Sequence, residues 1–524
     1  MYILISKLRK DVEMKNIENK KEVKALMNVK KVDIIKYLHI VIIIIGSIFV
    51  LFPCFHTTLW FDESYSVAIA SHPINEIWTI GSHDVHPVLY YIMLHILGIF
   101  TNGSILSYRI FSAIPLIILG ILGFTHIKKD FGEKVGLIFS FLILFMPVTF
   151  VYGGEIRMYT WGMFFITLTA MYAYRIYKSG VSKKNWIIFS IFSLSAAYTH
   201  YYGLIAAFVL NISLFLYFLI NNVKQRNYEV KYIKYSINLK YSIISAIIQI
   251  ILYIPWIGAF LSQYSSVSQG FWIKTINIVE MFDFQFTGNL DTRIYITKGI
   301  SYIFSLIMCI YMIYLFSKHF KEVKPARIAI RTYFLIIILL ALISIFTTIL
   351  YARYLLIITG IFLFALAYVM SKDKSKIRIA IICILIVAMS TAINIDLIKT
   401  NYDESNSKPM EYIREDIKPD DIILIDNNGS GFVVAAQFRE NKLYFWDRMN
   451  WNVEEAYKAY GKTIYNLDNL KDYKGRIWII GAWKDGFAEE AMKNLGGDID
   501  ILKSEYFGTK YREYQYVITL IERK

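Results

Sequence analysis

Residues 37–55 read YLHIVIIIIGSIFVLFPCF, a nearly unbroken apolar run that decides the fold. An α-helix needs about 20 such residues to cross the ~30 Å hydrocarbon core of a membrane. Similar runs recur from Tyr37 to about Asp396 and then stop. The chain of 524 residues is 56% hydrophobic, 16% aromatic and only 19% charged, a composition that soluble domains do not show. The sequence therefore predicts an α-helical polytopic membrane protein.

The distribution of charge orients the predicted helices. The formal net charge of +15 comes from Lys and Arg residues that cluster in short gaps between apolar runs, which argues against nucleic acid as a partner. Residues 1–36 are rich in lysine and are expected to form a cytoplasmic tail. Counting crossings from that tail gives roughly 11 transmembrane helices over residues 37–396, with residues 397–524 outside. The basic gaps then expected on the cytoplasmic side are 128–134, 178–184, 221–240, 318–327 and 372–378.

Residues 56–106 are predicted to form the first outer loop. Its first half is too polar to span a membrane, and its apolar run Val88–Phe100 is too short to cross, so this run is expected to lie in the interface or to re-enter. This choice decides the side on which every later gap lies. It places on the same outer face the gap after Val151, the gap around His200, residues 262–297 and the turn around Arg353.

Two further features restrict the functions to consider. Cys54, Cys309 and Cys383 lie in or beside apolar runs without the spacing of ligands, so neither a disulfide framework nor a zinc site is predicted. The predicted spans carry almost no ionisable group near the middle of the membrane, which argues against an ion-coupled transporter.

Acidic residues stand out in the first outer loop. Asp62 and Glu63 directly follow the first span, and a partly desolvated carboxylate there could act as a general base on an acceptor hydroxyl. The alternative is a solvated helix cap or an interfacial anchor. Asp84 and His86 precede Pro87, and they could hydrogen-bond to sugar and phosphate oxygens or hold a divalent ion, although Asp84 could also cap a helix. Because these ligands are few, no metal site is assigned.

Basic and aromatic residues occupy the other outer gaps. Arg157 and Arg353, each flanked by tyrosines, could bind a phosphate or diphosphate, and the alternative is contact with lipid headgroups. Sugar rings favour contact with aromatic and amide side chains, which an interfacial aromatic belt would also provide. Such side chains in these gaps include Tyr159, Tyr201, Gln263 and Trp272, together with the imidazole of His200.

The order and outward placement of these motifs resemble the integral-membrane glycosyltransferases of the GT-C fold. The resemblance is to the bacterial and archaeal family 39 group, which is related to protein O-mannosyltransferases and aminoarabinose transferases, and it covers roughly residues 37–368. One departure is Val88, where such proteins usually have a second proline. The strings that carry the resemblance are Asp62-Glu63, Asp84-Val85-His86-Pro87, Glu155-Ile156-Arg157-Met158-Tyr159, His200-Tyr201-Tyr202-Gly203, Pro255-Trp256 with Phe271-Trp272, and Arg353-Tyr354-Leu355.

The resemblance implies an inverting transferase that uses a polyprenyl-phosphate-linked sugar as donor. Asp62 would be the general base, Glu63 would orient Asp62 or contact the acceptor, and Arg157 or Arg353 would lie near the donor phosphate. A glycan, a lipid or a protein remains open as the acceptor, and a divalent metal remains open as a cofactor. Two other functions stay open: a transporter of a lipid or solute, and a non-catalytic membrane scaffold. The residues expected to bind substrate are Asp84, His86, Arg157, Tyr159, His200, Tyr201, Gln263, Trp272 and Arg353.

From residue 397 onward, short β-rich runs alternate with amphipathic helices. This pattern predicts a small α/β domain, which we expect to hold or screen the acceptor over the membrane site. The β-rich runs are 422–425, 431–438, 443–446, 477–480 and 514–521.

Overall fold

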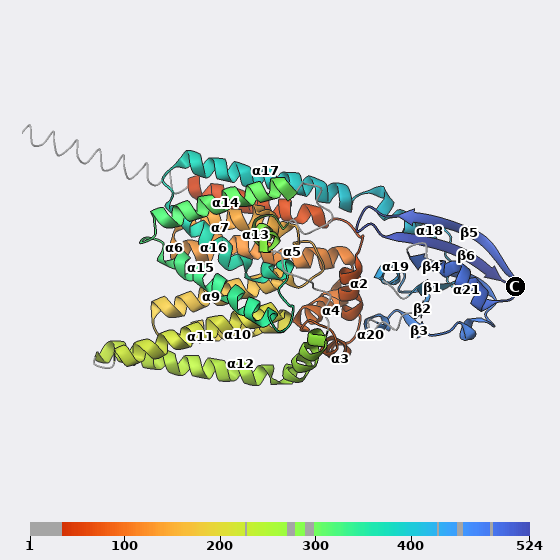
Figure 1. Ribbon diagram of the computed structural model, residues 1–524, viewed down its shortest axis with the longest axis horizontal. Helices are drawn as coiled ribbons and strands as arrows, with labels where there is room; N and C mark the ends of the chain where they lie inside the picture. The colour runs from red at the N-terminus through yellow and green to blue at the C-terminus, as the bar shows by residue number, and fades with distance from the viewer. Residues whose placement is uncertain are drawn as a thin grey trace, which may run out of the picture.

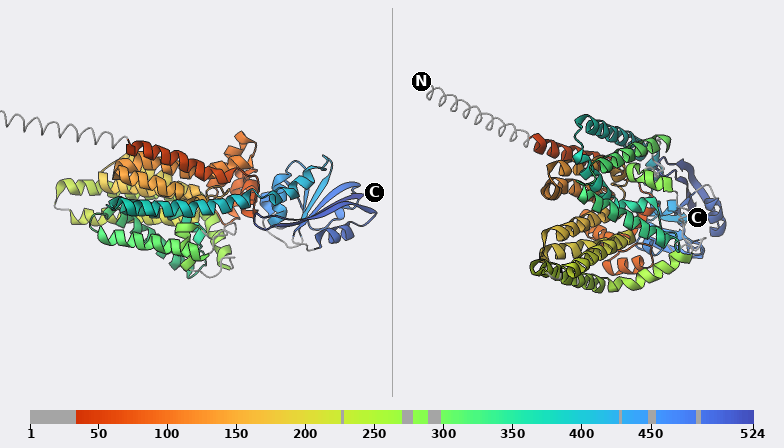
Figure 2. Two further views of the ribbon diagram at one scale, coloured as in Figure 1. Left: turned by 90° about the horizontal axis from the view of Figure 1, so that it is seen from above. Right: turned by 60° about the vertical axis from the view of Figure 1, so that its left-hand side comes forward.

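The computed structural model describes residues 34–225, 228–269, 278–288, 298–426, 429–447, 454–482 and 486–524. These residues form a bundle of helices with a β-sheet domain at one end (Figure 1). The first described helix, Ile34–Cys54, begins at the end of the bundle that lies away from the sheet (Figure 2). The bundle and the sheet domain are therefore arranged end to end.

The described helices confirm the predicted polytopic membrane fold. Eight of them are long and apolar enough to cross a membrane, compared with the roughly 11 predicted, and three other helices, α7, α9 and α10, pack among these eight. These three are α7 (Glu133–Phe145), α9 (Tyr159–Ser179) and α10 (Lys183–Thr199). The eight are Ile34–Cys54, Ile105–Phe131 (which contains α5, Ile105–Leu122, and α6, Lys128–Phe131), α11 (Tyr201–Lys224), α12 (Glu229–Gln269), α14 (Lys298–Lys318), α15 (Lys324–Ser344), Ala352–Lys372 (which contains α16, Leu356–Lys372) and α17 (Lys376–Asn401).

Helix α16 lies at the centre of the bundle. It is apolar on all sides, as expected of a helix that other helices surround, and 83% of its span is buried. Close packing against α9 depends on Gly360, because a Cβ atom at that position would overlap the hydroxyl of Thr167. On the outside of the bundle, the side chains of Ser193, Asn211 and Gln249 hydrogen-bond to one another and join α10, α11 and α12.

Residues 56–106, which are predicted to form the first outer loop, contain three short helices, α2 (Phe61–Ala70), α3 (Ile74–Ser82) and α4 (Leu89–Thr101). They contact one another and lie at the end of the bundle nearest to the sheet (Figure 1). Helix α4, which contains most of the short apolar run, has 13 residues and so a length of about 20 Å. It is too short to cross the hydrocarbon core of a membrane.

The C-terminal residues form the predicted α/β domain, a six-stranded sheet in the order β3-β2-β1-β4-β6-β5. Strands β1 to β4 are parallel, and β5 and β6 form an antiparallel hairpin at one edge. The strands are β1 (Ile422–Asp426), β2 (Lys442–Trp446), β3 (Gly461–Ile464), β4 (Gly475–Ala482), β5 (Ile499–Gly508) and β6 (Gln515–Arg523). The described helices are α18 (Lys408–Arg414), α19 (Gly429–Gln437), α20 (Glu454–Tyr457) and α21 (Phe487–Leu495).

One predicted β-rich run of this domain was wrong. Residues 431–438 lie almost entirely in helix α19. They were predicted as a strand because a short apolar run that is buried on all sides has the same pattern in a strand and in a helix. Strand β5 was missed because it is a sheet edge with mostly exposed side chains and no clear alternation of polar and apolar residues.

The C-terminal domain contacts the first outer loop directly. Three tyrosine hydroxyls from the domain each form a hydrogen bond with helix α2 or the residue that follows it: Tyr514 to the amide of Phe61 at 2.9 Å, Tyr457 to Ser64 at 2.9 Å and Tyr460 to Ser71 at 2.9 Å. Helices α19 and α20 also pack against α2. The domain is thus fixed over the residues that directly follow the first span.

Candidate active site

Two neighbouring acids at the start of α2 face different surroundings. The backbone of Trp60 is extended and ends the preceding segment, and Glu63 accepts a hydrogen bond from the Trp60 amide at 3.3 Å. Consecutive residues on an α-helix point about 100° apart, so Asp62 and Glu63 cannot share one environment. Asp62 faces two arginines and is partly exposed, whereas Glu63 points into the packed interior.

Asp62 lies between Arg157 and Arg353. Its Oδ2 atom is 4.0 Å from Arg157 Nε and 3.8 Å from Arg353 Nη1. The Asp62 side chain is 29% exposed, whereas those of Arg157 and Arg353 are 5% and 10% exposed. Both distances exceed that of a hydrogen bond, so neither arginine holds the carboxylate in a closed ion pair. The partly exposed carboxylate therefore stays accessible to a substrate.

The two arginines are held by different contacts. Arg157 donates hydrogen bonds to the carbonyl oxygen of Asp62 and to the hydroxyl of Ser66, each at 3.2 Å. The guanidinium of Arg353 lies over the rings of Trp60 and Tyr152, 5.1 and 5.4 Å from their centroids. Cation–π contact holds the Arg353 group in place and leaves most of its N–H donors for a ligand.

Glu63 forms a closed ion pair with Arg109. The two Glu63 oxygens lie 2.5 and 2.8 Å from the Arg109 guanidinium, and both side chains are almost completely buried. Glu63 also accepts hydrogen bonds from the Ile156 amide at 3.1 Å and from the Tyr511 hydroxyl at 3.3 Å. Of the two roles predicted for Glu63, these contacts favour orienting Asp62 over contact with an acceptor, and the role stays a prediction.

Removing the charge of Glu63 is expected to destabilise the fold. The Glu63→Gln variant leaves Arg109 buried without a counter-charge, which costs about 3–5 kcal/mol of unfolding free energy. The measurement is the unfolding temperature of the purified protein in detergent. The matched control is Glu133→Gln, because Glu133 pairs with Lys128 at 2.6 Å where both side chains are partly exposed, and such pairs contribute about 0–1 kcal/mol. Equal shifts in the two variants would contradict the structural role of the Glu63 pair.

Two histidines and one further acid lie beside the Asp62 cluster. Asp84 accepts a hydrogen bond from the Tyr91 hydroxyl at 3.2 Å, and burial raises the pKa of Asp84 above its ordinary value. The rings of His86 and His200 lie 5.0 Å apart. Burial lowers the pKa of both imidazoles, that of His200 to about 3, so both are neutral near pH 7.

These imidazoles offer free hydrogen-bonding atoms. Nδ1 of His86 and Nε2 of His200 are buried and have no hydrogen-bond partner among the described residues. Buried polar atoms of this kind are available to a ligand or to an ordered water. The ring of Tyr354 makes edge-to-face contacts with both histidines, 4.8 Å from His200 and 5.9 Å from His86.

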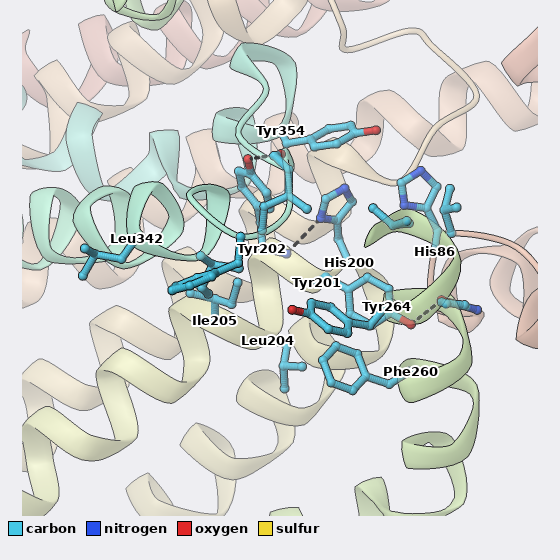
Figure 3. A pocket seen from close by; sticks show the side chains of 16 residues that line it. His86, His200, Tyr201, Tyr202, Leu204, Ile205, Phe260, Tyr264, Leu342 and Tyr354 are labelled. Atoms are coloured by element: carbon cyan, nitrogen blue, oxygen red, sulfur yellow. Dashed lines mark hydrogen bonds between the residues drawn. The ribbon is translucent and has the colours of Figure 1, made fainter. Parts of the chain in front are cut away.

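An apolar cavity of about 490 Å³ begins at the two histidines (Figure 3). Two of its lining residues, Leu342 and Phe346, are 52% and 81% exposed, so the cavity opens at the apolar outer surface of the bundle. Helices α11, α12 and α15 supply most of its walls. Its polar lining residues are His86, His200, Tyr201, Tyr202, Gln263 and Tyr354, and its apolar ones include Leu204, Ile205, Phe260, Leu342, Ile343 and Phe346.

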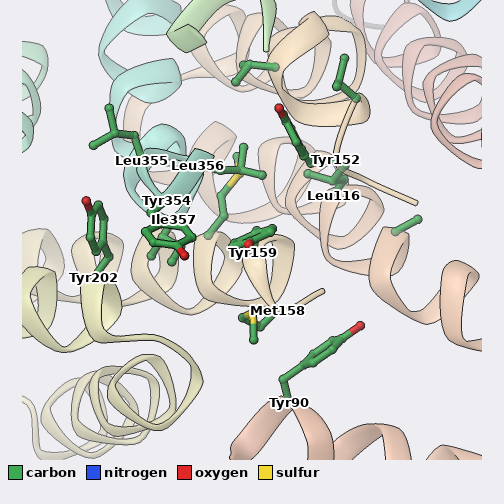
Figure 4. Close-up of a cluster of buried hydrophobic side chains, with 14 of the residues drawn as sticks. Tyr90, Leu116, Tyr152, Met158, Tyr159, Tyr202, Tyr354, Leu355, Leu356 and Ile357 are labelled. Atoms are coloured by element: carbon green, nitrogen blue, oxygen red, sulfur yellow. The ribbon is translucent and has the colours of Figure 1, made fainter. Parts of the chain in front are cut away.

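The remaining predicted residues lie close to this cavity. Gln263 donates a hydrogen bond to the Gly81 carbonyl at 2.7 Å and accepts one from the Tyr201 hydroxyl. The rings of Tyr159 and Tyr354 pack at 6.0 Å, beside Tyr202 (Figure 4). Trp272 lies outside the described residues. The structure thus brings together Asp62, Asp84, His86, Arg157, Tyr159, His200, Tyr201, Gln263 and Arg353, from five segments that are far apart in the sequence.

The sequence analysis missed several residues of this cluster. Arg109 lies inside an apolar run, and an arginine in that position is a signal for a buried partner. Arg512 and Tyr511 come from the loop between two strands of the C-terminal domain, and nothing in the sequence links them to Glu155 or Glu63. Among the described residues, no group of three His, Cys, Asp or Glu side chains is placed to hold a metal ion. The structure therefore adds no third ligand of these types to Asp84 and His86, where a divalent metal was left open.

No protein-family model matches the chain, and neither does any curated protein. Solved structures do match. ArnT from Cupriavidus metallidurans in the apo state superposes with a TM-score of 0.59 at 8% identity, over 92% of this chain and 97% of that chain. The same protein bound to undecaprenyl phosphate gives a TM-score of 0.55 at 8% identity over the same shares. The oligosaccharyltransferase of Archaeoglobus fulgidus is more distant, with a TM-score of 0.43 at 13% identity over 88% of this chain and 67% of that chain.

These likenesses show the fold alone, which is the GT-C fold that the motifs predicted. They do not show the narrower resemblance to the family 39 group.

Proposed function

We propose that this chain is an inverting glycosyltransferase that moves a sugar from a polyprenyl-phosphate donor to an acceptor hydroxyl or amine. The observation that carries the proposal is the position of Asp62 between Arg157 and Arg353, next to a cavity that opens toward lipid. The capture of undecaprenyl phosphate by ArnT, a protein of the same fold, supports a lipid phosphate as the donor class.

The charges of the site favour an anionic ligand. Arg109 is paired with Glu63, and Arg512 is paired with Glu155 at 3.1 Å. Arg157 and Arg353 then share the single charge of Asp62, and burial opposes a second negative charge on Asp84 by raising its pKa, so the cluster has an excess of positive charge whenever Asp84 is neutral. A phosphate group that enters this buried region would form charge-assisted hydrogen bonds with two guanidinium groups.

The same geometry can support transfer of the sugar. The acceptor oxygen or nitrogen attacks C1 of the sugar from the face opposite the phosphate, and its proton moves to Asp62. The bond between C1 and the phosphate oxygen breaks, and the electron pair stays on the lipid phosphate. Arg157 and Arg353 stabilise the negative charge that grows on this leaving group, so they interact more strongly with the transition state than with the bound donor.

The cavity suits the lipid part of such a donor. The isoprenoid chain would lie against Leu342, Phe346 and their neighbours, where it stays in contact with the bilayer. The free nitrogen atoms of His86 and His200, which line the cavity, could hydrogen-bond to the phosphate or to a sugar hydroxyl. This arrangement places the reactive carbon of the sugar at the boundary between lipid and water.

We assign the site to the extracytoplasmic side of the membrane. The predicted cytoplasmic gaps meet one another at the end of the bundle away from the sheet: Lys134 donates to the Asp373 carbonyl at 2.8 Å, and Lys324 lies 5.3 Å from the Tyr177 ring. Clustered basic residues favour the cytoplasmic face, so the opposite end, with the site and the C-terminal domain, would face outward.

The test is to incubate the purified protein with a panel of polyprenyl-phosphate sugars and candidate acceptors. Mass spectrometry should show that one donor is consumed and that a product with a new glycosidic bond appears. A transporter would instead produce substrate-dependent flux across vesicle membranes without any new bond. Flux without transfer for every donor would overturn the proposal.

The affinity for a lipid phosphate is expected to weaken as pH rises, because of Asp84. Burial raises the pKa of Asp84, so the neutral acid persists above its usual range, and ionisation at higher pH cancels the excess positive charge of the site. One added negative charge should weaken binding by about tenfold. The Asp84→Asn variant should lose this weakening, as measured by titration with undecaprenyl phosphate across the pH range in which both proteins stay folded. Identical pH profiles for the two proteins would contradict it.

A further inference from the structure

The tip of the β5–β6 hairpin reaches from the C-terminal domain to the candidate active site. Two of its residues, Arg512 and Glu513, have left-handed backbone angles, with φ of 60° and 53°. This conformation is unfavourable for residues other than glycine and persists where surrounding contacts enforce it. The neighbouring tyrosines supply such contacts: the Tyr511 hydroxyl binds Glu63, and the Tyr514 hydroxyl binds the Phe61 amide.

Arg512 forms an ion pair that joins the two parts of the chain. Its Nη2 atom donates to Glu155 Oε1 at 3.1 Å, and the side chains of Arg512 and Glu155 are 11% and 1% exposed. The Arg512 guanidinium also stacks on Trp60, 4.0 Å from the ring centroid. Arg353 lies over the same Trp60 ring at 5.1 Å, so the indole contacts an arginine from each part of the chain.

Glu155 links this pair to the phosphate-binding cluster. It is two residues from Arg157, and its carboxylate interacts electrostatically with Arg353. A buried carboxylate requires a counter-charge. If Arg512 did not supply it, Arg353 would be the arginine that Glu155 attracts, and Arg353 would then be drawn away from Asp62.

We infer that Arg512 is a positioning residue of the active site, which neutralises Glu155 and thereby leaves Arg353 for Asp62 and the donor phosphate. The inference rests on the proposed function and deepens it. Arg512 does not contact the reacting atoms. It makes the geometry of the site depend on the docked C-terminal domain, so this domain completes the site as well as covering it.

The test compares four variants by their affinity for undecaprenyl phosphate and by kcat and KM for sugar transfer. Arg512→Gln should weaken phosphate binding and raise KM by about 30-fold, because Glu155 then competes for Arg353. Arg512→Lys should keep most of the affinity, since the lysine still carries the counter-charge. The double variant Glu155→Gln with Arg512→Gln should regain an affinity within about fivefold of the wild type, because the competing carboxylate is gone.

Arg439→Gln is the matched control. Arg439 also belongs to the C-terminal domain and also contacts the membrane bundle, through a hydrogen bond to the Gly103 carbonyl at 3.3 Å, but it does not contact Glu155. This variant should bind undecaprenyl phosphate like the wild type. Equal losses in Arg439→Gln and Arg512→Gln, or a double variant as defective as Arg512→Gln alone, would overturn the inference. A wild type that binds the phosphate but transfers no sugar would overturn the proposed function, while the binding series would still decide the role of Arg512.

Discussion

Replacement of Asp62 by asparagine is expected to lower kcat for sugar transfer by about 1000-fold, the loss that follows when a general base is removed. Asparagine has nearly the same shape as aspartate but cannot accept the acceptor proton. Arg157 is held through the backbone carbonyl of Asp62 and through Ser66, so the substitution leaves its position unchanged. The affinity for the donor should stay the same or rise, because the neutral side chain no longer repels a phosphate.

Steady-state kinetics with the donor identified in the panel, together with titration with undecaprenyl phosphate, would measure both effects of Asp62→Asn. Asp130→Asn is the matched control, because Asp130 pairs with Arg175 at 2.7 Å at the opposite end of the bundle. Its kcat should stay within about threefold of the wild type, as expected for a partly exposed pair away from the site. An Asp62→Asn variant that keeps more than about a tenth of the wild-type kcat would rule out Asp62 as the base.

The comparison of Asp62 with Glu63 shows how far the sequence could predict this site. Both acids stand out because a charged pair directly follows an apolar span, and the sequence offers no reason to treat them differently. Their separation arises from the helical rotation between consecutive residues and from Arg109, which lies in another helix. The role of a carboxylate depends on its partners, and partners in other helices are fixed only by the packed bundle.

The long apolar helices were the most predictable part of the fold. Their length and hydropathy follow from the thickness of the membrane, which leaves few alternatives. The proximity of Arg157 and Arg353 was also predictable. Counting spans along the chain assigns the gaps that contain these two residues to the same face of the membrane. The contact between Arg512 and Glu155 was not, since it depends on how a separately folded sheet docks onto the bundle. Helix α19 was mistaken for a strand because its apolar run is too short to show a period.

Exchange of Arg353 for glutamine should lower kcat/KM by about 100-fold or more, as expected for the loss of one cation that stabilises a leaving group. Arg353 is a cleaner probe than Arg157, whose hydrogen bonds also hold helix α2. The Nε atom of Arg353 has no hydrogen-bond partner among the described residues, and its ring contacts with Trp60 and Tyr152 leave the donors of the group available.

The response to Arg353→Lys separates charge from shape. Lysine keeps the positive charge but cannot form the planar, two-pronged contact with phosphate oxygens, so an intermediate loss is expected. The control is Arg378→Gln, because Arg378 pairs with Asp373 at 2.6 Å at the end of the bundle away from the site. A non-catalytic scaffold would tolerate Arg353→Gln as well as Arg378→Gln. If both variants bind undecaprenyl phosphate and turn over like the wild type, Arg353 does not stabilise the leaving phosphate, and the charge excess at Asp62 has no catalytic role.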